Sequence, residues 1–179
     1  HEHPTQAILD MTSLQEKFGY LKGLKVGIIG DISHSRVALS NIHGLKTMGA
    51  EVTLCGPSTL IPPFAEDLGV SVNYNVDEVI EWADALNVLR IQRERMGGGL
   101  LPSVREYRNL FGITTERLSM HKKEIVIMHP GPMNRGVEID SSVADSDQAI
   151  ILDQVLNGVA SRMAILYLLL GGKQEQENS

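Results

Sequence analysis

The chain has 179 residues, of which 42% are hydrophobic and 21% charged, and this composition is typical of a globular domain rather than of a disordered chain. A formal net charge of −6, without any run of Lys and Arg, argues against a nucleic-acid partner, because phosphate binding needs clustered cations. The single cysteine, Cys55, excludes an internal disulfide and a multi-cysteine metal site, which fits a reducing compartment.

Apolar residues recur at helical spacing over residues 4–18, and Pro4 and Gly19 suit the two ends of a helix. The chain then alternates between short apolar runs, typical of buried strands, and segments with helical spacing. The expected strands are residues 24–30, 51–55, 70–73, 85–89 and 125–128. The further expected helices are residues 35–48, 62–68, 76–83, 103–110, 114–120 and 146–170.

This alternation predicts an α/β fold with a doubly wound parallel sheet of about five strands, flanked by helices. In such sheets ligands bind beyond the carboxyl ends of the strands. Candidate chemistry therefore belongs in the loops that follow Ile29, Cys55, Leu89 and Met128.

Two polar residues, His3 and Gln6, stand three positions apart at the start of the first helix and can face the same side. A helix N-terminus offers free N–H groups and a positive dipole end, which suits an anion. His3 can donate to a developing oxyanion, and Gln6 can both donate and accept. The alternative is an ordinary helix cap with an exposed His. A metal site at His1 and His3 would need a third ligand that the sequence does not show.

Arginines follow two of the expected strands. Arg36 lies near the end of the first strand, where a guanidinium can bind a carboxylate bidentately. Arg90 and Gln92 would point to one side of an extended segment, and the glycines at residues 97–99 would allow that loop to move. The alternatives are surface ion pairs and an ordinary charged loop. An NAD site is disfavoured, because Gly30 does not belong to a G-x-G-x-x-G motif.

The loop after the last strand begins with the sequence HPGP at residues 129–132. Its prolines and glycines fix an unusual backbone, whose carbonyl groups could accept hydrogen bonds from an attacking amine. The alternative is a rigid turn, which the same residues would also make.

Taken in order, four segments closely resemble the aspartate carbamoyltransferase family, and the resemblance extends over residues 1–172. They read HPTQ from His3, GDISHSR from Gly30, LRIQRER from Leu89 and HPGPMNRGVEI from His129. The resemblance implies transfer of a carbamoyl group from carbamoyl phosphate to the amino group of L-aspartate, which gives N-carbamoyl-L-aspartate and phosphate in pyrimidine biosynthesis. It implies a cytoplasmic transferase with no metal and no organic cofactor.

The resemblance also implies a role for each site residue. His3 would be the catalytic residue that polarises the carbamoyl carbonyl, and it would bind carbamoyl phosphate together with Gln6, Gly131 and Pro132. Two arginines would select a dicarboxylic amino acid. The expected aspartate ligands are Arg36, Arg90 and Gln92.

The family carries an earlier carbamoyl-phosphate domain that this sequence lacks, so we expect the chain to be a fragment, or to be completed by another polypeptide, and to be inactive alone. Residues 1–18 would be an interdomain helix, residues 19–145 the aspartate-binding domain, residues 146–172 a helix returning to the missing domain, and residues 173–179 a disordered tail. Residues 150–170 include polar side chains, which indicates a buried helix end rather than a membrane span. The apolar face that would pack on the missing domain consists of Ile151, Val155, Val159, Met163, Leu166 and Leu170.

The expected partners are the two small-molecule substrates, a homotrimer formed through the missing domain, and a companion chain or dihydroorotase-type protein, with no nucleic acid and no membrane. Two other functions stay open. One is a non-catalytic aspartate-binding or regulatory module. The other is ornithine carbamoyltransferase, which the resemblance disfavours because the loop equivalent to residues 129–132 typically carries a Cys in that enzyme, whereas Cys55 lies elsewhere.

Overall fold

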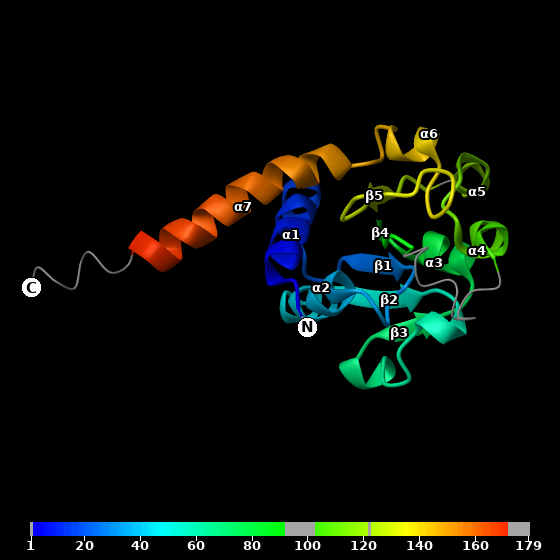
Figure 1. The fold of residues 1–179 in the computed structure, drawn as a ribbon, viewed down its shortest axis with the longest axis horizontal. Coiled ribbons are helices and arrows are strands. Elements are labelled where there is room, and N and C mark those ends of the chain that lie inside the picture. Colours follow the sequence, from blue (N-terminus) through cyan, green and yellow to red (C-terminus); the bar gives the residue numbers. More distant parts are fainter. Residues whose placement is uncertain (1, 92–102, 122, 172–179) are drawn as a thin grey trace, which may run out of the picture.

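The structure, a computed structural model, describes residues 2–91, 103–121 and 123–171. Expectations about Gln92, the glycines at residues 97–99 and the tail at residues 173–179 therefore lie outside the described residues. Five strands form one parallel sheet in the order β3-β2-β1-β4-β5, which confirms the predicted doubly wound sheet (Figure 1). The strands are β1 (Lys25–Ile29), β2 (Glu51–Cys55), β3 (Ser71–Asn73), β4 (Ala85–Val88) and β5 (Val126–Met128).

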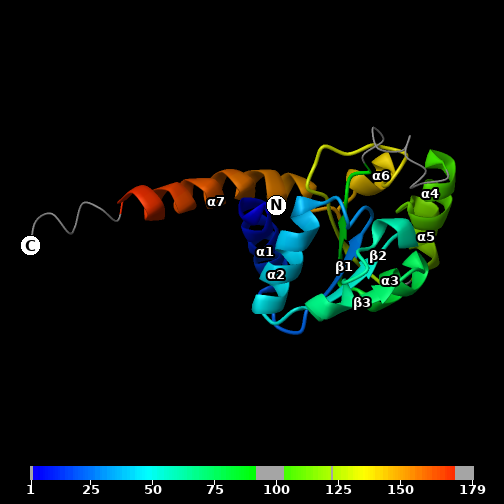
Figure 2. The ribbon, with the colours of Figure 1, turned by 60° about the horizontal axis from the view of Figure 1, so that its bottom comes forward.

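Helices cover both faces of the sheet (Figure 2). The helices α1 and α2 lie against one face, whereas α3, α4 and α5 lie on the other (Figures 1 and 2). The described helices are α1 (Pro4–Phe18), α2 (Arg36–Thr47), α3 (Val76–Trp82), α4 (Val104–Phe111), α5 (Thr115–Met120), α6 (Ser141–Ala144) and α7 (Ile151–Gly171). The strands alternate with most of these helices in the predicted order.

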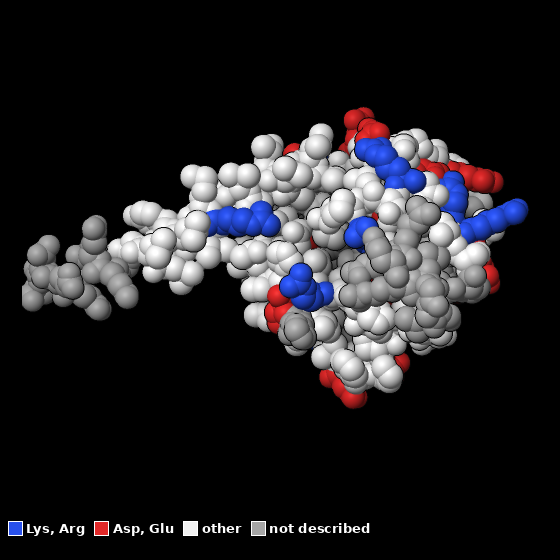
Figure 3. Space-filling model, viewed as in Figure 1, with Lys and Arg blue, Asp and Glu red and all other residues white. Residues whose placement is uncertain are grey.

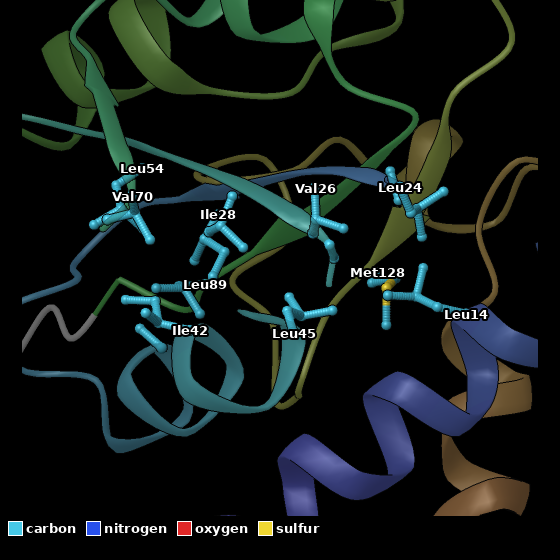
Figure 4. Packing of buried hydrophobic residues seen from close by; sticks show 14 of the residues in the cluster. Leu14, Leu24, Val26, Ile28, Ile42, Leu45, Leu54, Val70, Leu89 and Met128 are labelled. Atoms are coloured by element: carbon cyan, nitrogen blue, oxygen red, sulfur yellow. The ribbon is translucent and has the colours of Figure 1, made fainter. Parts of the chain in front are cut away.

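Each face of the sheet has its own hydrophobic core, because neighbouring residues of a strand point to opposite faces. In β1, Ile28 packs with α1 and α2, and the next residue, Ile29, packs with α3 and α4. Figure 4 shows the first core, in which Ile28, Ile42 of α2 and Leu89 lie together. The strands are therefore buried on both sides, which explains their nearly continuous apolar sequences.

Local signals set the ends of the first two helices as expected. Gly19 ends α1 in the left-handed conformation with φ of 79°, and its N–H donates to the carbonyl of Gln15. Ser35 caps α2 by accepting a hydrogen bond from the N–H of Ala38. His3 and Arg36 stand at the start of α1 and α2, and both lie at the carboxyl-end side of the sheet, where they share a pocket with Arg90 after β4.

Two helix predictions are wrong. No α-helix forms over residues 62–68, where the chain makes turns and the 3₁₀ segment Glu66–Leu68, because consecutive prolines at 62 and 63 supply no N–H groups to a short helix. The last helix begins at Ile151 rather than at residue 146. The preceding segment bonds instead to the edge of β5: Ile127 N–H donates to Gln148, and Ile150 N–H donates to Ile127.

The expectation of a buried C-terminal helix is wrong for this chain. Among the described residues, α7 projects from the body of the molecule (Figure 1), and its buried positions are Gln154, Gly158 and Ser161. The first turns of α7 pack on α1 and also contact β5. By length and composition alone, α7 is the one helix in the described part of the chain that could cross a membrane.

Candidate functional site

A pocket of about 230 Å³ lies where the strand order reverses, at the carboxyl ends of β1 and β4. This is the edge at which doubly wound sheets bind ligands. The pocket brings together every predicted site residue that the structure describes, from four separate parts of the chain. These residues are His3, Gln6, Arg36, Arg90, Gly131 and Pro132.

The start of α1 forms one wall of the pocket, and His3 is its N-cap. His3 Nδ1 accepts a hydrogen bond from the N–H of Gln6 at 3.3 Å, and His3 N–H donates to Ser40 Oγ at 2.8 Å. Because Nδ1 accepts, the neutral imidazole carries its hydrogen on Nε2. His3 can therefore donate from Nε2 to an oxygen of a bound molecule, as the sequence predicted.

Gln6 is 7% exposed and is held from behind the pocket wall by Asp10, a residue that the sequence analysis missed. Gln6 Nε2 donates to Asp10 Oδ1 at 2.9 Å. Burial raises the pKa of the Asp10 carboxyl, and the hydrogen bonds from neighbouring amide side chains oppose that rise. The spacing of four residues on one helix was the one local signal that could have connected Gln6 with Asp10.

The two arginines enter the pocket from the carboxyl ends of the central strands. Arg36 is the first residue of α2 and is exposed, whereas Arg90 follows β4 and is partly buried. The N-terminus of α2 adds the positive end of a helix dipole on the same side as Arg36. The pocket is therefore suited to a ligand with more than one negative charge.

Two titratable residues, Asp31 and His34, also line the pocket, and no site role was predicted for either. Asp31 is 6% exposed, and its Oδ1 accepts from the N–H of His34 at 3.2 Å and lies 2.8 Å from His34 Nδ1. Both residues belong to the loop after β1, where ligands of this fold bind, and that position was the available signal.

The loop after β5 forms the opposite wall, and its Gly131–Pro132 peptide bond is cis. Gly131 N–H donates to His129 Nδ1 at 2.9 Å, so the hydrogen of the neutral His129 ring is on Nε2, which lies 3.3 Å from Glu138 Oε1. Glu138 also accepts from the N–H of Asn134 at 2.6 Å. The buried His129 and Glu138 side chains therefore anchor the loop that carries Gly131 and Pro132.

The described part of the site offers hydrogen-bond donors and cations rather than a metal centre. No group of three or more His, Cys, Asp or Glu residues with the geometry of a metal site occurs in residues 2–91, 103–121 and 123–171. The arrangement can neutralise carboxylates or a phosphate, and it can hold an acyl group between the start of α1 and the loop after β5.

Comparison with known proteins gives a consistent result. The family model for the Asp/Orn-binding domain of aspartate/ornithine carbamoyltransferases matches residues 22–169. A relative from Gemmatimonas aurantiaca is 58% identical over 98% of the chain and 55% of its own length. A relative from Moorella thermoacetica is 61% identical over 96% of the chain and 56% of its own length. Both are described as the catalytic subunit of aspartate carbamoyltransferase.

Solved structures have the same fold. Ornithine carbamoyltransferase from Pyrococcus furiosus matches 97% of the chain with a TM-score of 0.80 and 26% identity. Aspartate transcarbamoylase from Trypanosoma cruzi, in complex with carbamoyl phosphate, matches 93% of the chain with a TM-score of 0.80 and 26% identity. The chain spans 58% and 55% of these two structures, and about half the length of the curated relatives that it matches.

Proposed function

Because the chain belongs to the aspartate/ornithine carbamoyltransferase family and matches its Asp/Orn-binding domain, we propose that it forms the aspartate-binding half of an aspartate carbamoyltransferase. The complete enzyme would transfer the carbamoyl group of carbamoyl phosphate to the amino group of L-aspartate. The products would be N-carbamoyl-L-aspartate and phosphate, made in pyrimidine biosynthesis.

The observation that carries this proposal is the meeting of His3 and Gln6 with two arginines in one pocket. Arg36 and Arg90, with Gln92, would bind the two carboxylates of aspartate. An amino acid with an amine side chain would leave one guanidinium without a negatively charged partner. This chemistry favours aspartate over ornithine, and the two relatives described above are aspartate carbamoyltransferases.

In the proposed reaction the aspartate amine attacks the carbamoyl carbon, and a tetrahedral oxyanion forms before phosphate leaves. His3 would stabilise this oxyanion from Nε2, because its Nδ1 is occupied by the Gln6 N–H. Gln6 and the backbone at Gly131 and Pro132 would orient the carbamoyl amide. Catalysis would then depend mainly on positioning and on electrostatic stabilisation.

We also propose that residues 1–18 and 146–172 connect the aspartate-binding domain, residues 19–145, to a carbamoyl-phosphate domain. The exposure of α7 supports this: Val155, Val159, Met163, Leu166 and Leu170 are all more than half exposed. Figure 3 shows that the visible face of the projecting helix is largely free of charged side chains. A soluble cytoplasmic homotrimer formed through that domain, with or without a companion chain, remains a prediction.

The apolar face of α7 leads to a prediction about the 179-residue chain alone. We expect it to self-associate as its concentration rises, because soluble monomers rarely leave so large an apolar surface exposed. A Leu166→Lys/Leu170→Lys variant should remain monomeric with an unchanged circular dichroism spectrum. Sedimentation velocity over a range of concentrations measures this, and a wild-type chain that stays monomeric throughout would contradict the prediction.

The proposed function is tested in a chimera, in which residues 1–179 follow the part of the Moorella thermoacetica relative that they do not match. We expect this chimera to form carbamoylaspartate from carbamoyl phosphate and L-aspartate, and to use L-ornithine at a rate at least about 100-fold lower, since L-ornithine has an amine in place of the side-chain carboxylate of aspartate. Turnover of L-ornithine instead would support ornithine carbamoyltransferase activity. Binding of aspartate without turnover would support a non-catalytic module.

A further inference from the structure

A buried carboxylate, Asp10 of α1, lies behind the wall of the pocket and is only 2% exposed. Four amide side chains from four different elements donate hydrogen bonds to it, and no Lys, Arg or His among the described residues forms an ion pair with it. The four donors are Gln6 on α1, Asn41 on α2, Asn87 on β4 and Gln154 on α7.

The two oxygens of Asp10 serve different parts of the molecule. Oδ1 accepts from Gln6 Nε2 at 2.9 Å and from Gln154 Nε2 at 2.8 Å. Oδ2 accepts from Asn41 Nδ2 at 2.7 Å and from Asn87 Nδ2 at 3.2 Å, within the core between α1, α2 and the sheet. Of the four donors, Gln6 lines the pocket, and it is held by Oδ1.

Gln154 extends the Oδ1 side of this network to the opposite wall of the pocket. Its Oε1 accepts from the backbone N–H of His129 at 3.0 Å, directly before the loop of Gly131 and Pro132. Because that buried N–H needs an acceptor, Gln154 must present its oxygen to His129 and its nitrogen to Asp10. The orientation of Gln154 therefore requires an acceptor at Asp10 Oδ1.

The acceptor at Asp10 Oδ1 also fixes the orientation of the Gln6 amide. A carboxylate can only accept hydrogen bonds, so the Gln6 amide must turn its nitrogen toward Asp10 and its oxygen away. None of the described groups donates a hydrogen bond to Gln6 Oε1. Gln6 therefore offers its oxygen as an acceptor to a molecule in the pocket.

We propose that Asp10 is a positioning residue for substrate specificity: it fixes the Gln6 oxygen toward the pocket, so that the site selects an acyl phosphate with an N–H donor on the reacting carbon. This inference rests on the proposed function. Carbamoyl phosphate has such an amide, whereas acetyl phosphate has a methyl group of similar size in the same place. Acetyl phosphate would leave Gln6 Oε1 without a partner, and sites built around a substrate N–H discriminate strongly against analogues that lack it.

The test compares two constants in the chimera: the KM for carbamoyl phosphate and the inhibition constant of acetyl phosphate as its competitor. In Asp10→Ala the Gln6 amide is free to rotate. We therefore expect the ratio of the two constants to fall about tenfold or more toward equal binding, since one hydrogen bond no longer distinguishes the two ligands.

Two matched variants distinguish an effect of Asp10 on the orientation of Gln6 from an effect on the stability of the fold. Asn41→Ala removes a donor on the Oδ2 side only, so it should lower the stability and leave the ratio unchanged. Asp10→Asn should also keep the ratio. The Oδ1 atoms of Asn41 and Asn87 are buried without a partner among the described residues, so these two amides can turn to accept from a new Nδ2 while an oxygen still faces Gln6.

A measurement on the wild-type chimera does not depend on any variant folding. We expect the Gln6 Nε2 hydrogen that is bonded to Asp10 to exchange slowly with solvent in the absence of ligand, because its acceptor is a buried carboxylate. Exchange as fast as that of an exposed glutamine would overturn the proposal. NMR with ¹⁵N-labelled glutamine side chains measures this, with Gln6→Leu identifying the resonance.

The outcomes distinguish the proposed carbamoyltransferase function from the positioning role proposed for Asp10. A wild-type chimera without carbamoyl transfer contradicts the proposed function, and amide exchange then decides the position of Gln6 independently. An active wild type in which Asp10→Ala weakens both ligands equally overturns the specificity role and leaves the proposed function intact. A loss of discrimination in Asn41→Ala as large as that in Asp10→Ala would also overturn it.

Discussion

Replacing Arg36 with alanine in the chimera is expected to raise the KM for L-aspartate about 100-fold or more, because a charge-assisted bond to a substrate carboxylate is lost in the pocket. Arg90→Ala should act in the same direction. The KM for carbamoyl phosphate should change much less in both variants, since its proposed contacts come from His3, Gln6 and the loop after β5. Steady-state kinetics with each substrate varied in turn measures the two values.

Two further variants make this prediction specific. Arg36→Lys keeps the charge but not the bidentate geometry, so we expect it to recover only part of the loss in aspartate affinity. Lys46→Ala removes a cation from the other end of α2, where Lys46 donates to the carbonyl of Gly69, and it should leave the KM for aspartate unchanged. If Arg36→Ala instead weakened carbamoyl phosphate and spared aspartate, the assignment of this arginine would be wrong.

Replacing Glu138 with alanine is expected to lower the free energy of unfolding of the 179-residue chain by about 2–6 kcal/mol, because two neutral donors lose their acceptor at about 1–3 kcal/mol each. Glu138 is fully buried and accepts from the N–H and side-chain amide of Asn134, and from His129 Nε2. Its removal takes the acceptor away from the Asn134 N–H and from the buried His129 Nε2, whereas Asn134 Nδ2 keeps its hydrogen bond to the Ile91 carbonyl. Urea unfolding followed by circular dichroism measures the change, in a variant background that does not self-associate.

The controls for this prediction differ in burial and in chemistry. Glu138→Gln retains one acceptor oxygen and should cost less than the alanine variant. Glu124→Ala removes an exposed carboxylate and should change the free energy of unfolding by less than about 0.5 kcal/mol. A Glu138→Ala variant as stable as the wild type would show that the loop after β5 does not depend on its buried anchor.

The helices and strands that the sequence predicted well are those with strong local signals. The bounds of α1 agree with the prediction at both ends, because Pro4 and Gly19 mark them and the apolar residues between have helical spacing. The two wrong helix predictions, for residues 62–68 and for the start of the last helix at residue 146, have competing or non-local causes. In the segment before α7, Ala149 N–H donates to Ser146 in a turn, and residues 148 and 150 bond to Ile127 of β5. No local pattern in the sequence indicates that β5 is the partner.

The sequence also predicted three of the loops that meet at the site, those after Ile29, Leu89 and Met128, since parallel strands bring their carboxyl ends to one edge. The loop after Cys55, which was expected there too, does not line the pocket. His3, Arg36, Arg90 and Pro132 were each assigned from local motifs and the family resemblance, and the structure places all four in one pocket. Their roles toward substrates are still proposals, and the assignment of Gln92 lies outside the described residues.

The sequence by itself therefore determined the order of strands and helices along the chain and the edge of the sheet that carries the pocket. It also determined several of the polar residues that line the pocket. Only the tertiary structure decided how those residues are held. Asp10 and Gln154 are 144 positions apart, yet they share a hydrogen bond of 2.8 Å that extends to His129. Spacing along a helix or strand governs contacts within a few residues, whereas the partner of a buried polar group is set by which elements pack together.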